Sequence, residues 1–163
     1  MILNSDAIDS RGYIDSRYTC DADNSSPELR WENIPDKVAG FALVAEDPDA
    51  SHGLFTHWVI YNIPTNIHHL PAGIPPQEVL PNGIKQGVNS SNKLGYAGPC
   101  PPAQARDHGR SDHHYVFRLY ALAVLPEIST RATREELLKA IEPYILEQTE
   151  LTGLYHRNMQ KAG

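Results

Sequence analysis

The sequence predicts a mainly β fold with a short helical segment near the C-terminus. Three apolar runs, at residues 41–46, about 57–62 and 115–123, are typical of strands. Long segments rich in turn-forming residues separate these runs, and a clear helix start follows the third. A chain of 163 residues can bury a full core without metal or disulfide support. We therefore expect one domain spanning residues 1–163.

The elements expected in the first 64 residues are predicted by the alternation of apolar and polar residues and by turn-forming residues. Leu29 and Trp31 alternate with polar neighbours, as in a half-buried strand. Residues 20–27 combine Asp, Asn, Ser and Pro and predict a loop. The strands at 41–46 and 57–62 come next, and the second ends before Pro64 because proline cannot donate to a strand ladder.

The later elements are two long connections, a strand and a helical tail. Residues 64–83 are rich in proline, and residues 89–112 are rich in Asn, Ser, Gly and Pro. Both segments therefore predict long irregular loops, which in a compact domain are usually functional or mobile. The strand at 115–123 follows. Thr133 and Glu136 form a capping box that opens a helix through about Ile141, and Pro143 can begin a second short helix. Residues 150–157 predict a last strand or an extended tail.

Composition and charge exclude several classes of partner. With 14 basic and 20 acidic residues the chain carries a net charge of −6, which argues against nucleic-acid binding and, more weakly, against charge-driven docking on anionic lipid. No run approaches the roughly 20 apolar residues of a transmembrane helix. The first residues have neither a basic nor an apolar region of a secretory signal, so we expect a cytoplasmic protein.

Cys20 and Cys100 are the only cysteines. Two thiols so far apart in the sequence make neither a zinc site nor a disulfide framework. In a reducing compartment we expect both to be free, with a single disulfide as the alternative. The eight histidines show no spacing of a structural zinc site, so we expect no metal and no other cofactor.

Three short segments hold most of the chemically reactive residues. Asp47, Asp49 and His57 lie around the first two strong strands, and His113 and Tyr115 lie at the start of the third. Between them is the Gly/Pro loop at residues 95–102. Acids, imidazoles and a stiff loop at strand ends predict a pocket on a rigid β scaffold.

The chemistry of such a pocket suits an anion. Two imidazoles can donate to it, Asp47 can hold one imidazole in a defined tautomer, and the N–H groups of Gly98 and Cys100 can point at an oxyanion. The structural alternatives are a sheet histidine for His57, turn residues for the two aspartates and a core position for Tyr115. We assign five of the other histidines to loops or solvent, and both tryptophans to the core. The histidines are His68, His69, His108, His114 and His156, and the tryptophans are Trp31 and Trp58.

The chain resembles the phosphatidylethanolamine-binding protein family, also called the Raf kinase inhibitor-like family, in its bacterial and archaeal branch. The resemblance extends over nearly the whole chain. It is carried by Tyr-Thr-Cys-Asp at 18–21, Ser-Pro-Glu-Leu-Arg-Trp at 26–31, Asp-Pro-Asp-Ala at 47–50 with residues 55–64, Gly-Tyr-Ala-Gly-Pro-Cys-Pro-Pro at 95–102, His113 with Tyr115, and Glu-Leu-Thr-Gly-Leu-Tyr at 150–155.

The resemblance implies a β-sandwich of two antiparallel sheets with a few peripheral C-terminal helices. It also implies a small cavity that binds phosphate, phosphoryl headgroups or acetate. By motif position, and with Cys100 added from the same loop, the expected ligand-binding residues are Asp47, Asp49, His57, Gly98, Cys100, Pro101, His113 and Tyr115.

The sequence departs from the family pattern at three places. Ser51 replaces a proline that often follows a cis bond, which a non-proline residue adopts only at a cost of about 2.5–4 kcal/mol. His114 replaces an arginine, so a fixed fork of positive charge is lost. The loop at 103–112 is long and carries Arg106, Asp107, His108 and Arg110, which indicates a rebuilt cavity rim.

Two functions remain open at this point. The first is a binding module for a small anion or phospho-ligand that modulates a protein kinase or protease, with a homodimer as the candidate assembly. The second is a hydrolase or transferase with His57 and His113 as acid and base, or with Cys100 as nucleophile. No serine elbow is present and Cys100 lies between prolines, so the sequence favours the non-enzymatic reading.

Overall fold

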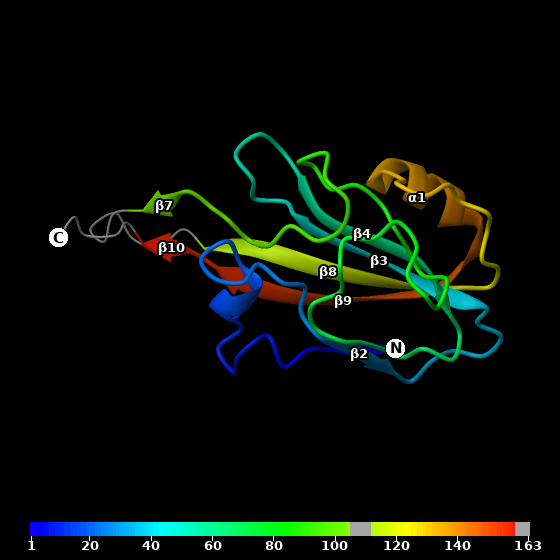
Figure 1. The fold of residues 1–163 in the computed structure, drawn as a ribbon. Helices are drawn as coiled ribbons and strands as arrows, with labels where there is room; N and C mark the ends of the chain where they lie inside the picture. The colour runs from blue at the N-terminus through cyan, green and yellow to red at the C-terminus, as the bar shows by residue number, and fades with distance from the viewer. Residues whose placement is uncertain (105–111, 159–163) are drawn as a thin grey trace.

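The computed structural model describes residues 1–104 and 112–158. Its main feature is a five-stranded antiparallel sheet in the order β6-β4-β3-β8-β9 (Figure 1). The strands are β3 (Gly40–Asp47), β4 (Phe55–Pro64), β6 (Lys85–Gln86), β8 (His113–Leu122) and β9 (Ile145–Tyr155).

A second antiparallel sheet packs against the first. It is formed by β1 (Ile2–Asn4), β2 (Leu29–Glu32) and β5 (His69–Leu70), in the order β1-β2-β5. A short parallel pair, β7 (Ala103–Gln104) with β10 (Arg157–Asn158), projects from the body (Figure 1). The remaining elements are the 3-10 turn Ser16–Tyr18, helix α1 (Arg134–Ile141) and the 3-10 turn Glu142–Tyr144. The expected mainly β fold of two antiparallel sheets is thus confirmed.

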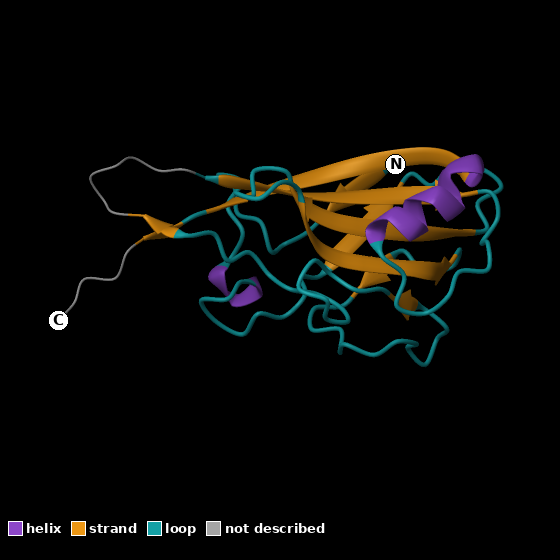
Figure 2. Ribbon diagram, turned by 90° about the horizontal axis from the view of Figure 1, so that it is seen from above, coloured by secondary structure: helices purple, strands orange, loops and turns teal. Residues whose placement is uncertain are grey.

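The large sheet is covered on both faces. Between the two sheets lies a buried cluster that includes Trp31, Phe41 and Trp58. On the opposite face Val59 and Leu137 belong to a second cluster, where α1 lies across the sheet (Figure 2). Both faces of β3 and of the middle of β4 are buried, which agrees with the unbroken apolar runs at residues 41–45 and 58–61.

The helical tail agrees with the sequence, whereas the last strand is longer than predicted. The side chain of Thr133 accepts from the backbone N–H of Glu136, and the Glu136 carboxylate accepts in return from Thr133. The short turn after α1 carries Pro143, as expected. The strand expected at 150–157 begins at Ile145 and ends at Tyr155, because β9 pairs with β8 over that whole length.

The sheet order places the predicted site residues at one end of the molecule. β3 runs antiparallel to both β4 and β8, so the end of β3 meets the beginnings of its two neighbours. In register, Asp47 pairs with Phe55 and Glu46 pairs with Val116. Asp47, from the last position of β3, therefore lies beside the first residues of β4 and β8.

A β-bulge in β4 falls at His57. Ala45 pairs with Trp58 and Glu46 with Thr56, so His57 is the extra residue opposite β3. A bulge re-aims the side chain of its extra residue and is common beside functional sites. Here it lets His57 line a cavity on the face of the sheet that also carries Tyr115.

Candidate functional site

A cavity of about 610 Å³ lies at the strand ends. Its walls come from β3, β4 and β8, from the loop before β7, and from the loop that follows the first 3-10 turn. The predicted site residues that line it are Asp47, His57, Gly98, Cys100, Pro101, His113 and Tyr115. The structure thus brings together residues from all three segments singled out in the sequence.

His57 is a buried imidazole with one nitrogen engaged by the backbone. Its Nδ1 lies 2.5 Å from the carbonyl oxygen of Ala97, which can only accept, so Nδ1 carries the proton. The ring also contacts Phe55 and Tyr115, with centroid distances of 4.6 and 5.2 Å. Burial lowers the pKa of His57, against the opposing effects of the Ala97 carbonyl and the Asp47 charge. The ring is therefore neutral at pH 7.

The imidazole of His113 also uses its Nδ1 atom, which forms a hydrogen bond with Asp47. The distance from His113 Nδ1 to Asp47 Oδ2 is 2.7 Å, and the Asp47 side chain is only 4% exposed. The other carboxylate oxygen of Asp47 accepts from the backbone N–H of Asp49 at 2.7 Å. With both oxygens engaged, Asp47 fixes the orientation of the His113 ring, which is the positioning role that carboxylates commonly have for histidine.

Tyr115 lies between the two imidazoles. Its ring is edge-on to His57 and stacked with His113 at a centroid distance of 6.4 Å. Burial, followed by the nearby Asp47 charge, raises the pKa of Tyr115 above its usual range, so the hydroxyl keeps its proton. Within the described residues this hydroxyl and both imidazole Nε2 atoms have no hydrogen-bond partner.

Asp49, one of the expected ligand-binding residues, is not among the residues that line the cavity. Its Oδ2 accepts from the backbone N–H of His114 at 2.8 Å and lies 2.7 Å from His114 Nδ1. Burial alone would raise the pKa of Asp49, but the contacts with His114 outweigh it and lower the pKa. His114 is therefore a local partner of Asp49, and neither residue is part of the cavity lining. Ser51 does line the cavity, and the described backbone contains no cis peptide bond.

Gly98 has a structural role in place of the predicted donor role. Its N–H donates to Asn24 Oδ1 at 2.9 Å and is not available to an oxyanion. A Cβ at this position would collide with the backbone carbonyl of Tyr18 and with the Asn24 side chain. Glycine is required here because two loops approach each other closely at this point.

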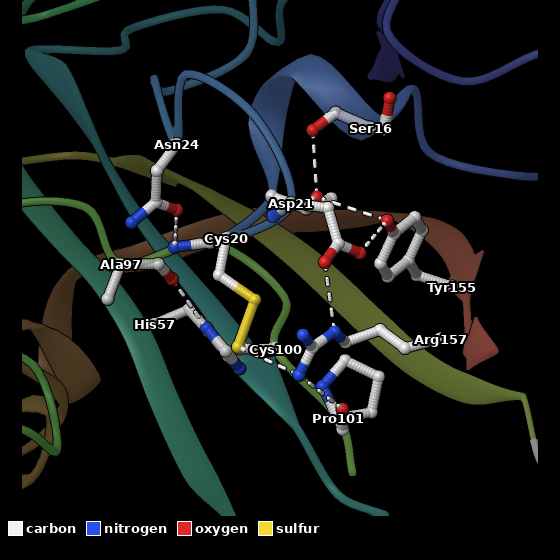
Figure 3. Close-up of a disulfide and its surroundings, with 12 residues drawn as sticks. Ser16, Cys20, Asp21, Asn24, His57, Ala97, Cys100, Pro101, Tyr155 and Arg157 are labelled. Carbon is white, nitrogen blue, oxygen red and sulfur yellow. Dashed lines mark hydrogen bonds and ion pairs between the residues drawn. A yellow bond between two sulfur atoms is a disulfide. The ribbon is translucent and has the colours of Figure 1, made fainter. Parts of the chain in front are cut away.

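The prediction of free thiols was wrong, because Cys20 and Cys100 form a disulfide (Figure 3). The two residues are 80 positions apart, and the fold brings their loops side by side, with the N–H of Cys20 donating to the carbonyl of Pro99 at 3.1 Å. Nothing in the local sequence indicates this proximity. A disulfide-bonded Cys100 has no thiolate, so it is not a nucleophile in this structure.

Several residues that line the cavity were not predicted from the sequence. Lys93 brings an exposed ammonium group to the cavity, and Asn24, Phe55 and Tyr96 complete its polar and aromatic walls. Phe55 and Tyr96 fall inside the matched motifs and could have been chosen by motif position, whereas Lys93 lies in a loop without a distinguishing pattern. The basic residues predicted for the loop at 103–112, Arg106 and Arg110, lie outside the described residues, as do Asp107 and His108.

Neither a metal cluster nor a membrane-spanning helix is found in residues 1–104 and 112–158. No group of three or more His, Cys, Asp or Glu side chains in this part of the chain is placed to hold a metal ion. No helix in the same residues is long and apolar enough to cross a membrane.

Relatives of known sequence match nearly the whole chain. The family model described as phosphatidylethanolamine-binding protein matches residues 4–156. A UPF0098 protein of Methanothermobacter thermautotrophicus is 43% identical over 157 residues, which cover 96% of this chain and 99% of the relative. A UPF0098 protein of Pyrococcus horikoshii is 40% identical over 155 residues, covering 94% of this chain and 75% of the relative.

Solved structures show the same fold. A phosphatidylethanolamine-binding protein homologue from Chlamydia trachomatis superposes with a TM-score of 0.81 at 31% identity, over 96% of this chain and 97% of that one. The Escherichia coli protein YbcL, described as a member of the mammalian phosphatidylethanolamine-binding protein family, gives a TM-score of 0.83 at 26% identity, over 94% and 96% of the two chains. By sequence match, by fold and by the motifs that meet at its cavity, this chain belongs to the phosphatidylethanolamine-binding protein family.

Proposed function

We propose that the cavity binds a small anion together with a proton, and that the protein acts as a binding module. The observation that carries this proposal is the pair of imidazoles on either side of Tyr115. Both rings belong to lining residues of the cavity; in each, Nδ1 contacts a protein acceptor and Nε2 has no partner in the described residues.

The proton follows from the state of these groups. A neutral imidazole with Nδ1 protonated can only accept at Nε2, so it repels the lone pairs of a bare anion. An anion is bound once an imidazole takes up a proton at Nε2, or when the ligand brings its own proton, as monohydrogen phosphate does. The Tyr115 hydroxyl and the Lys93 ammonium add donors that are present without proton uptake.

The chemical class of ligand is therefore a phosphoryl or carboxyl group. The cavity volume of about 610 Å³ lies within the range of small-molecule sites and exceeds the needs of a single inorganic anion. Aromatic and proline side chains supply apolar wall around the polar groups, among them Phe55, Tyr96 and Pro101. An anionic head with a small organic substituent fits this arrangement.

The hydrolase or transferase alternative has less support. Cys100, the nucleophile considered for it, is bonded to Cys20. Modulation of a protein kinase or protease and a homodimer stay predictions that rest on the family resemblance. The disulfide favours an oxidising compartment unless it is reduced reversibly.

Sulfate titration followed by histidine NMR shifts tests the proposal, since sulfate does not titrate near neutral pH. Wild type should bind one sulfate with shifts of the His57 and His113 ring signals. His57→Ala and His113→Ala should each weaken binding by about 10- to 100-fold, the equivalent of one charge-assisted hydrogen bond of roughly 1.5–3 kcal/mol. His114→Ala is the matched control, because this neighbour in β8 lies outside the cavity lining. Wild-type affinity in both cavity variants would overturn the proposal.

A further inference from the structure

The Cys20–Cys100 disulfide is part of the cavity wall. Both residues line the cavity; Cys20 is half-buried and Cys100 is exposed to solvent. Figure 3 shows the bond joining the loop after the first 3-10 turn to the Gly/Pro loop, beside His57 and Ala97. A bond at this place is accessible to a thiol and adjacent to the proposed ligand site.

Hydrogen bonds hold the Gly/Pro loop firmly only on the N-terminal side of Cys100. Tyr96 donates from its hydroxyl to the carbonyl of Tyr18 at 2.7 Å. The N–H of Gly98 donates to Asn24, and the carbonyl of Pro99 accepts from Cys20. These contacts fix residues 96–99 whether or not the disulfide is present.

The segment from Cys100 to Pro102 has much weaker support. In the described residues its only other contacts of this kind come from Arg157, whose Nη1 lies 3.5 Å from the carbonyl of Pro101 and 3.7 Å from Cys100 Sγ. The next paired residue is Ala103, in the two-residue strand β7. Pro101 is buried, whereas Cys100 and Pro102 are exposed, so the disulfide and the packing of Pro101 anchor this stretch of wall.

Arg157 also favours reduction of the bond. Its guanidinium lies beside Cys100 Sγ, while its Nε donates to Asp21 Oδ1 at 3.0 Å (Figure 3). The other carboxylate oxygen of Asp21, Oδ2, accepts a hydrogen bond from the hydroxyl of Tyr155. A positive group next to a sulfur stabilises its thiolate and makes it the better leaving group in thiol–disulfide exchange.

We propose that the Cys20–Cys100 disulfide is a thiol-exchange site for a dithiol reductant and that its reduction loosens the wall of the anion cavity. This proposal rests on the proposed anion binding. A thiolate of the reductant attacks Cys20 Sγ, the bond to Cys100 breaks, and Cys100 leaves as a thiolate beside Arg157. The second thiol of the reductant then attacks the mixed disulfide and releases Cys20, which takes a proton. Two electrons pass from the dithiol, which becomes a disulfide.

The oxidised protein is the binding-competent form. With the disulfide intact, residues Cys100–Pro102 are already ordered in the ligand-free protein. After reduction these residues must be ordered during binding, which weakens affinity by about tenfold or more. The scaffold around His57 and His113 stays unchanged, because strand pairing and not the disulfide places these side chains.

Sulfate titration of three samples tests the proposal: oxidised wild type, wild type reduced with dithiothreitol, and the Cys20→Ser/Cys100→Ser double variant. Near-UV circular dichroism checks that each sample is folded. The oxidised form should bind at least about tenfold tighter than both others. Equal binding in all three would overturn the inference while leaving the proposed function intact. Unfolding of both the reduced protein and the double variant would also overturn it, since the effect would then be global. Absence of binding in every sample would mean that the proposed function itself fails.

The role of Arg157 has a separate readout that needs no ligand. Arg157→Gln should slow reduction by dithiothreitol severalfold, as followed by thiol titration. Arg17→Gln is the matched control, an exposed arginine on the 3-10 turn near the same loop with no contact to the disulfide. Equal reduction rates in wild type and Arg157→Gln would refute the stabilisation of the Cys100 thiolate.

Discussion

Replacing His57 by asparagine should remove a pH dependence from the stability of the protein. His57 is buried, and burial lowers its pKa. Asparagine does not titrate, and its amide N–H can still donate toward the carbonyl of Ala97, which now accepts from His57 Nδ1. The comparison of wild type with His57→Asn therefore isolates the proton equilibrium of one ring.

The sign follows from proton linkage. In the unfolded chain the pKa of a histidine is about 6.5, whereas in the folded protein the pKa of His57 is lower. Between these two values the unfolded state binds the extra proton, so the free energy of unfolding falls as the pH falls. For one proton the limiting slope is about 1.36 kcal/mol per pH unit. Above about pH 7.5 the contribution vanishes because both states are neutral.

Urea denaturation between pH 8 and pH 5 measures the effect. The stability difference between wild type and His57→Asn should be constant above about pH 7.5 and should shift against wild type below about pH 6.5. Saturating sulfate should reduce the shift, because a bound anion favours the protonated ring. His69→Asn is the control, since His69 is exposed. A difference that stays constant from pH 8 to pH 5 would refute the assigned burial effect.

Three substitutions test other parts of the structure by urea denaturation. Gly98→Ala should lower the free energy of unfolding by about 1–3 kcal/mol and weaken sulfate binding, because the added methyl group collides with the backbone carbonyl of Tyr18. Unchanged stability would mean that the loops carrying Tyr18 and Gly98 are not tightly packed. Glu46→Ala should lower the free energy of unfolding by about 3 kcal/mol, since the buried carboxylate contacts Arg118 at 2.7 Å and Arg134 at 2.5 Å. A loss of stability below about 1 kcal/mol would contradict a structural role for this ion-pair cluster. Thr133→Ala should cost about 1 kcal/mol through loss of the capping box, and Thr133→Ser should restore most of it.

The parts of the fold that sequence could predict are those with strong local signals. The buried strands β3, β4 and β8 are apolar runs, and the helix start carries its own capping box. The short strand β1 and the first half of β9 have no such signal, because strand pairing to a neighbour determines them.

The site shows the same division. Residues in matched motifs, such as His57 and His113, lie in the cavity. Partners that depend on tertiary proximity were missed or misassigned. Asp49 meets His114 outside the lining, the Gly98 N–H is used by a loop more than 70 residues away, and Cys20 meets Cys100.

The most direct test of whether His57 and His113 hold the anion is the number of protons taken up when sulfate binds. Isothermal titration of sulfate at pH 7 in buffers of different ionisation enthalpy gives the number of protons taken up per ligand bound. If the two imidazoles hold the anion, wild type takes up about one to two protons per sulfate, because at least one ring must change from acceptor to donor. Uptake should fall to near zero in a His57→Asn/His113→Asn variant examined at saturating sulfate. Sulfate binding in wild type without proton uptake would contradict the account.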